Sequence, residues 1–77
     1  MLSIAAPRDG QTVAADTVFP VCDALWIPTA GNIQVQFESG SIVTFYNFVG
    51  GDYLPGKFIK IVSAGSTCAG PFIAVNI

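Results

Sequence analysis

The stretch NIQVQFESGSIVTFYNF, residues 32–48, decides the fold because it predicts two antiparallel strands joined by a tight turn. Its first half alternates strictly between apolar and polar residues, which is typical of a strand with one face in a core. The motif ESG at 38–40 fits a three-residue hairpin loop, a type I turn closed by Gly40 in the left-handed region. This loop fixes the register and places Val43 opposite Val35 on the core face.

The second strand of this hairpin, SIVTFYNF at 41–48, is apolar on both faces. Phe45 lies opposite Ile33 on the core face. The other face is lined by three expected pairs: Gln36 with Ile42, Gln34 with Thr44, and Asn32 with Tyr46. A chain of 77 residues is too small to cover both faces with its own layers, so we expect another subunit to cover this one. The residues expected at an interface with another subunit or a capsid are Ile42, Tyr46, Phe48, Gln34, Gln36 and Tyr53.

The composition supports the same expectation. Apolar residues make up 52% of the chain and charged residues only 10%, although small proteins have the most surface per residue. Such an excess indicates apolar surface that another chain buries. With three cations and a net charge of −2, the chain lacks the basic footprint that nucleic-acid binding requires, and we expect no nucleic-acid partner.

The remaining segments predict an all-β, single-domain antiparallel β-barrel or sandwich of five to six short strands over residues 1–77. Residues 1–22 are expected to form an extended N-terminal arm with one or two short edge strands, and residues 23–77 the β-barrel core. Residues 24–27, 57–64 and 72–77 are expected strands, whereas 48–56 is expected to be a loop. The residues expected in the core are Leu25, Trp26, Ile33, Val35, Phe37, Val43 and Phe45.

Residues that could perform chemistry are few. The chain has no His, and its carboxylates, which we expect to cap turns, are Asp9, Asp16, Asp23, Glu38 and Asp52. We therefore expect no catalytic site, no cofactor and no metal site. Cys22 and Cys68 are interpreted as small buried hydrophobic residues, with a disulfide between them as the alternative.

Pro, Gly, Asn and Asp interrupt every apolar run, so we expect no membrane association. The opening residues lack the features of a signal peptide, so we expect the chain to be synthesised in the cytosol.

A function of a different class, carbohydrate binding, is the more distant alternative. Trp26, Tyr46 and Tyr53 could form a stacking platform for sugars, as in a carbohydrate-binding module.

The ordered motifs AL-x-I-x-TAGNI-x-V-x-F-x-SG, VTF-x-N, G-x-x-LPG and AGST, within residues 24–67, resemble a family of very small virion proteins of tailed phages and gene transfer agents. Members of this family are labelled head decoration or spike base proteins. The arm, Cys68 and Gly70-Pro71 lie outside the matching pattern.

The resemblance implies a non-enzymatic β-barrel subunit on the outside of a capsid, assembled in the host cytoplasm. It implies a homo-oligomer, with a trimer favoured and a pentamer as the alternative, bound to the major capsid protein. The favoured function is a decoration (cement) protein. The alternative is the base protein of a head spike at a capsid vertex, which would also bind a spike protein.

Overall fold

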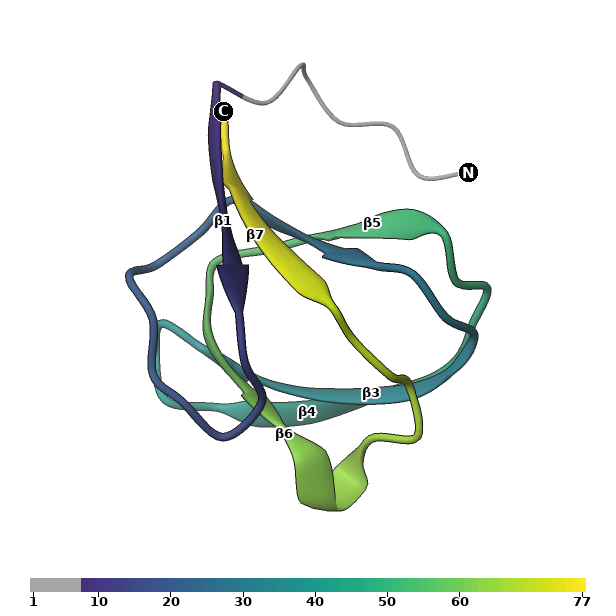
Figure 1. The fold of residues 1–77 in the computed structure, drawn as a ribbon. Coiled ribbons are helices and arrows are strands. Elements are labelled where there is room, and N and C mark those ends of the chain that lie inside the picture. Colours follow the sequence, from purple (N-terminus) through teal and green to yellow (C-terminus); the bar gives the residue numbers. More distant parts are fainter. Residues whose placement is uncertain (1–7) are drawn as a thin grey trace.

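A computed structural model of the chain describes residues 8–77, which fold into two antiparallel β-sheets packed face to face (Figure 1). The strands are β1 (Asp9–Val13), β2 (Ala24–Ile27), β3 (Gly31–Phe37), β4 (Ile42–Phe48), β5 (Asp52–Pro55), β6 (Phe58–Val62) and β7 (Phe72–Asn76), with one 3-10 turn, η1 (Ser63–Gly65). The strand orders are β1-β7-β2-β5 and β4-β3-β6. The all-β prediction is confirmed as a sandwich rather than a closed barrel, because consecutive strands β4 and β5 belong to different sheets.

The described residues contain seven strands, one more than the upper limit expected from the sequence. The addition is β5, which lies in residues 48–56, where the sequence predicts a loop. This strand is only four residues long and ends in Pro55, so it has no periodicity of its own. It forms because its residues pair with β2, with Leu54 opposite Leu25.

The hairpin of β3 and β4 has the predicted register, with Val35 opposite Val43 and Ile33 opposite Phe45. Gly40 has a φ of 97°, and its amide donates to the carbonyl of Phe37 (2.9 Å). The glycine-closed loop is therefore confirmed, because this φ is accessible to glycine at little cost.

The register changes near the end of β4. Ile33 pairs with Phe45, but Gly31 pairs with Phe48, so β4 contains one extra residue. The bulge includes Asn47, whose φ is 59° and whose amide donates to the side chain of Asn32 (3.2 Å). The predicted Asn32–Tyr46 pair is therefore wrong, and the bulge turns Phe48 toward the core instead of the outer face.

Both sheets contribute to the core. Of the residues expected there, Leu25, Ile33 and Val35 have no exposed surface, while Phe37 and Phe45 are half-buried and pack against the same cluster. Trp26 is half-buried on the opposite face of β2, because its neighbours Leu25 and Ile27 occupy the core face. Val43 is 40% exposed, because it lies on an edge strand that the second sheet covers only in part.

Residues 14–22 run from β1 along the outer edge of β6. The amide of Phe19 donates to Ile59 (2.9 Å), and the amide of Cys22 donates to Phe58 (3.1 Å). Phe19 is buried in the core cluster as well. This segment therefore supplies backbone partners to β6 and closes that side of the sandwich.

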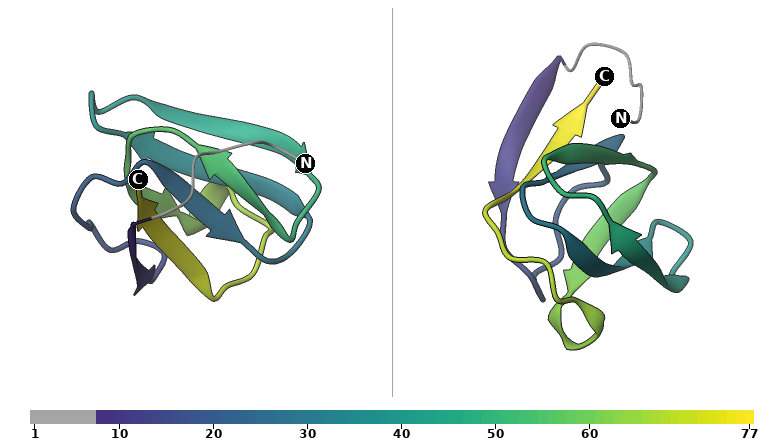
Figure 2. Two further views of the ribbon diagram at one scale, coloured as in Figure 1. Left: turned by 90° about the horizontal axis from the view of Figure 1, so that it is seen from above. Right: turned by 90° about the vertical axis from the view of Figure 1, so that its right-hand side faces the viewer.

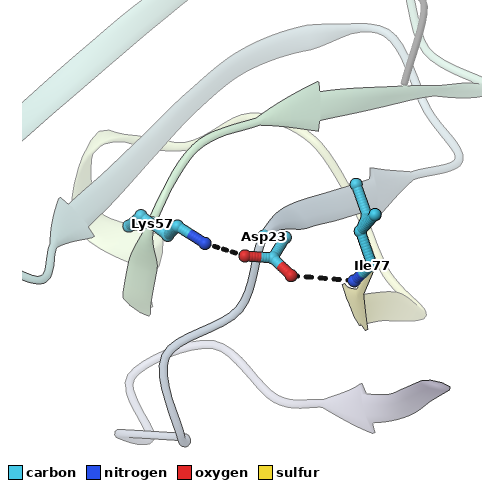
Figure 3. Close-up of polar contacts among 3 residues, drawn as sticks. All are labelled: Asp23, Lys57 and Ile77. Carbon is cyan, nitrogen blue, oxygen red and sulfur yellow. Dashed lines mark hydrogen bonds and ion pairs between the residues drawn. The ribbon is translucent and has the colours of Figure 1, made fainter. Parts of the chain in front are cut away.

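Asp23 holds the start of β2 in place (Figure 3). One oxygen of its carboxylate forms an ion pair with Lys57, after β5, and the other accepts the amide of Ile77, after β7 (2.8 Å). Its backbone amide donates to Val75 (2.9 Å), and its carbonyl accepts from Gly56 (2.9 Å). One residue thus connects β2 to both neighbouring strands of its sheet.

Candidate interface at the β4 edge

Within residues 8–77, the two edges of the three-stranded sheet differ in how they are covered. β6 is bordered by residues 14–22, as described above. β4 lies at the opposite edge of the same sheet, and Figure 2 (left) shows it along the margin of the molecule. At seven residues it is the longest strand at an edge of either sheet in the described chain. A long edge strand presents unpaired backbone groups that can pair with another chain.

The β4 edge also lacks the charges that usually protect such strands. Residues 39–51 contain no Asp, Glu, Lys or Arg. Three apolar side chains of β4 are nevertheless exposed: Ile42 by 55%, Val43 by 40% and Tyr46 by 72%. Val49, directly after the strand, is 72% exposed. An uncharged apolar edge of this kind is typical of a surface that another polypeptide covers.

A cleft of about 360 Å³ opens between β4 and β5, where a closed barrel would have paired strands. It is lined by Phe45, Tyr46, Asn47, Phe48, Val49, Asp52 and Leu54. Asp52 is the one buried charged residue of the described chain, and its carboxylate accepts the amide of Tyr53 (2.8 Å). The cleft gives the β4 edge a concave, largely apolar inner side.

The structure places only part of the predicted interface on this edge. Ile42 and Tyr46 lie there and are exposed. Gln34 and Gln36 lie on the central strand β3 and are half-buried. The side-chain amide of Gln34 donates to Thr44 Oγ1 (3.0 Å), and that of Gln36 donates to the carbonyl of Gly40 (3.2 Å). These two glutamines therefore serve the hairpin itself.

The two remaining predicted interface residues lie elsewhere. Phe48 packs against the core, and Tyr53 lies in the other sheet. Conversely, Val43 and Val49 are exposed at the edge but were not expected there. The signal that could have identified them is the uncharged run of residues 39–51, which marks the whole edge rather than one face of it.

The three aromatic residues considered for sugar binding do not form one platform. The rings of Trp26 and Tyr53 are 5.1 Å apart but inclined by 61°, edge to face. Tyr46 lies on β4, in the other sheet. Because a sugar ring stacks on a flat aromatic face, this arrangement does not support the carbohydrate-binding alternative.

Both cysteines are free thiols in the structure. Cys22 is 1% exposed within the core, and Cys68 is half-buried. Burial raises the pKa of both thiols. Each is therefore protonated at neutral pH and is a poor nucleophile.

Asp9 and Asp16 use their carboxylates in hydrogen bonds that stabilise local structure. Asp16 accepts hydrogen bonds from the hydroxyl and the amide of Ser63, and these bonds lower the pKa of its carboxyl. Asp9 accepts the amide of Gly10 (2.9 Å). Within residues 8–77, no cluster of three or more His, Cys, Asp or Glu side chains could hold a metal ion. Nor does this part of the chain contain a helix long and apolar enough to span a membrane.

Comparison with known proteins gives a likeness of fold. No family model matches the sequence, and no curated protein matches it. The chain is similar to a chain of the solved structure "Capsid of native GTA particle computed with C5 symmetry", with a TM-score of 0.74 and 20% sequence identity. The similarity covers 94% of this chain and 86% of that chain. The two chains therefore share the sandwich over almost their full lengths.

Proposed function

We propose that this protein is a non-enzymatic structural component of a virion, a decoration (cement) subunit on the outer surface of a phage or gene-transfer-agent capsid. The observation that carries the proposal is the shared fold with a chain of a GTA capsid, which extends over 94% of this chain. The motif resemblance within residues 24–67 points in the same direction.

The surface of the subunit supports this proposal. A decoration protein acts by burying area against its neighbours, and the β4 edge offers uncharged apolar surface for that purpose. The expected partners are further copies of the chain, with a trimer favoured, and the major capsid protein. Each contact can be weak, because many copies on one shell together stabilise it strongly.

The proposal is tested on purified particles from a host that carries the gene. Quantitative mass spectrometry should find the protein in the particles at hundreds of copies, and particles from a deletion strain should lose their contents at a lower temperature. Complementation with the wild-type gene is the control. Absence of the protein from purified particles would contradict the proposal.

The base of a head spike is the second candidate. The similar capsid structure was computed with C5 symmetry, which is the symmetry of a capsid vertex. A spike base would be present at a few dozen copies per particle, and its deletion would remove the spikes without changing the heat resistance of the shell. The copy number and the heat resistance therefore separate the two candidates.

A further inference from the structure

We propose that the β4 edge is self-complementary. Two copies of the chain join through an antiparallel β4–β4 pair, related by a two-fold axis at Thr44. The three-stranded sheet of one copy then continues into that of the other. The proposal does not depend on the proposed function, because it concerns the isolated chain.

The backbone supplies the first part of the argument. The amide of Phe37 donates to the carbonyl of Ser41 (2.8 Å), at the start of the ladder between β3 and β4. Hydrogen-bonded residues alternate along an antiparallel strand, so Val43 and Phe45 are the next residues of β4 that bond to β3. The N–H and C=O groups that point toward the free edge are therefore those of Ile42, Thr44 and Tyr46.

A two-fold axis at Thr44 matches these groups to one another. It places Thr44 opposite Thr44 of the second copy, and Ile42 opposite Tyr46 of the second copy. All three residues carry outward-pointing groups, so each of these pairs can exchange both of its backbone hydrogen bonds. The whole free edge from Ile42 to Tyr46 is then paired.

The side chains fit the same register. Ile42 is 55% exposed and Tyr46 is 72% exposed, and the axis brings each against the other on the outer face. On the inner face, Val43, which is 40% exposed, lies opposite Phe45 of the second copy. Pairs of aromatic and β-branched residues are favourable across antiparallel strands, and no charged residue opposes them here.

Neighbouring registers fit less well. An axis at Val43 sets Tyr46 against Gly40 in the hairpin loop, where the strand has ended. An axis at Phe45 brings Asn47, with its φ of 59°, into the paired segment. The register centred on Thr44 avoids the loop and ends at Tyr46, the first residue of the bulge, before the positive φ of Asn47.

The other sheet edges that no segment within residues 8–77 borders, those of β1 and β5, are less suited to such pairing. β1 follows Arg8 and begins with Asp9, so a copy of itself would meet charges. β5 has four residues and ends in Pro55. Among the described strands, β4 combines length, absence of charge and self-complementary residues. In a shell, this contact would join subunits of neighbouring oligomers.

The register is tested by exchanging charges. One variant carries Ile42→Lys and Tyr46→Lys, and a second carries Ile42→Glu and Tyr46→Glu. Both positions are exposed, so the substitutions leave the core intact. In each variant alone, like charges meet across the two-fold axis, whereas a mixture pairs Lys with Glu. The matched control is Val18→Lys, because Val18 is 68% exposed but lies outside β4.

Native mass spectrometry and sedimentation measure the outcome. The wild type and the Val18→Lys control should form a dimer of twice the 8.0 kDa chain mass. Each doubly charged variant should dimerise at least about tenfold more weakly, and mixing the two should restore a one-to-one heterodimer. Should a double variant fail to fold, the single variants Ile42→Lys and Tyr46→Glu are mixed, since one Lys–Glu pair and one wild-type pair favour their heterodimer.

Three results would overturn the proposal. They are a monomeric wild type at millimolar concentration, charged variants that associate like the wild type, and a mixture that remains monomeric. Presence of the protein in virions is decided by a separate measurement. Either inference can therefore fail without the other.

Discussion

Replacing Phe45 or Tyr46 with Ala tests which face of β4 belongs to the core. These neighbours point to opposite faces, since Phe45 packs against the core cluster and Tyr46 is 72% exposed. A fully buried Phe→Ala change costs about 3–5 kcal/mol. Because Phe45 is half-buried, we expect Phe45→Ala to cost about 2–3 kcal/mol. Tyr46→Ala should change the free energy of unfolding by less than about 0.5 kcal/mol.

Urea unfolding followed by the fluorescence of Trp26, the single tryptophan of the chain, measures both effects. A small domain has an m-value near 1 kcal/mol per molar urea, so the midpoint of Phe45→Ala should fall by about 2–3 M. Such a loss is a large part of the roughly 4–12 kcal/mol expected for a domain of this size. Dilute protein is used, because association through β4 would itself stabilise the fold.

Phe45→Leu is the matched control and should retain most of the stability, since it keeps an apolar side chain on the core face. Equal destabilisation by Tyr46→Ala and Phe45→Ala would refute the assignment of faces. So would a larger effect of Tyr46→Ala. The larger effect of Tyr46→Ala would mean that the register of β3 and β4 is shifted by one residue, whereas equal effects would mean that both faces of β4 are packed within the subunit.

Three further predictions concern residues outside the β4 edge. Asp23→Ala should lower the free energy of unfolding by about 1–2 kcal/mol in urea titrations, because the amide of Ile77 loses its acceptor. Lys57→Met should lower it by less than about 0.5 kcal/mol, because the Lys57 side chain is 63% exposed. Hydrogen bonds from Ser63 lower the pKa of the Asp16 carboxyl, so the ionised carboxylate stabilises the fold above its unfolded pKa near 3.8, and this stability is lost as the pH falls through the lower folded pKa. Asp16→Asn should remove this acid dependence from the melting temperature. An unchanged dependence of the melting temperature on pH would contradict this prediction. Gly40→Ala should cost about 1–2 kcal/mol through its positive φ alone, since no atom lies within 4 Å of the added carbon, and Gly40→Asn should cost less in the same thermal melts.

The hairpin could be predicted in detail because its determinants are local. The alternation of Ile33, Val35 and Phe37 defines one face, and the ESG loop leaves one register that pairs apolar residues. The all-β class follows from the same pattern repeated in short segments. These signals involve neighbouring residues and need no knowledge of the other sheet.

The remaining features depend on contacts that are distant in the sequence. The bulge at Asn47 involves the side chain of Asn32, and β5 exists because β2 offers it a partner. The exposure of Val43 depends on how far the second sheet extends over β4. Phe48 could not be placed correctly without the bulge, because one extra residue reverses the direction of its side chain.

The edge position of β4 is likewise determined by the order of strands in the sheet and not by the local sequence. Two apolar faces indicate a covered strand, and the alternation of residues predicts that another subunit covers its outer face. In the structure, the exposed apolar residues lie along the edge and on both faces of it. The run of residues 39–51 without charge matches this exposed apolar edge more closely than a single outer face of β4 does.

Amide hydrogen exchange at Ile42, Thr44 and Tyr46 tests the central claim, that other chains cover the β4 edge, most directly. The exchange is measured in dilute free protein and in purified particles that contain it. We predict fast exchange in the dilute chain and strong protection in the particles, with Val43 and Phe45 protected in both. Equally fast exchange of the three edge amides in both samples would contradict the account.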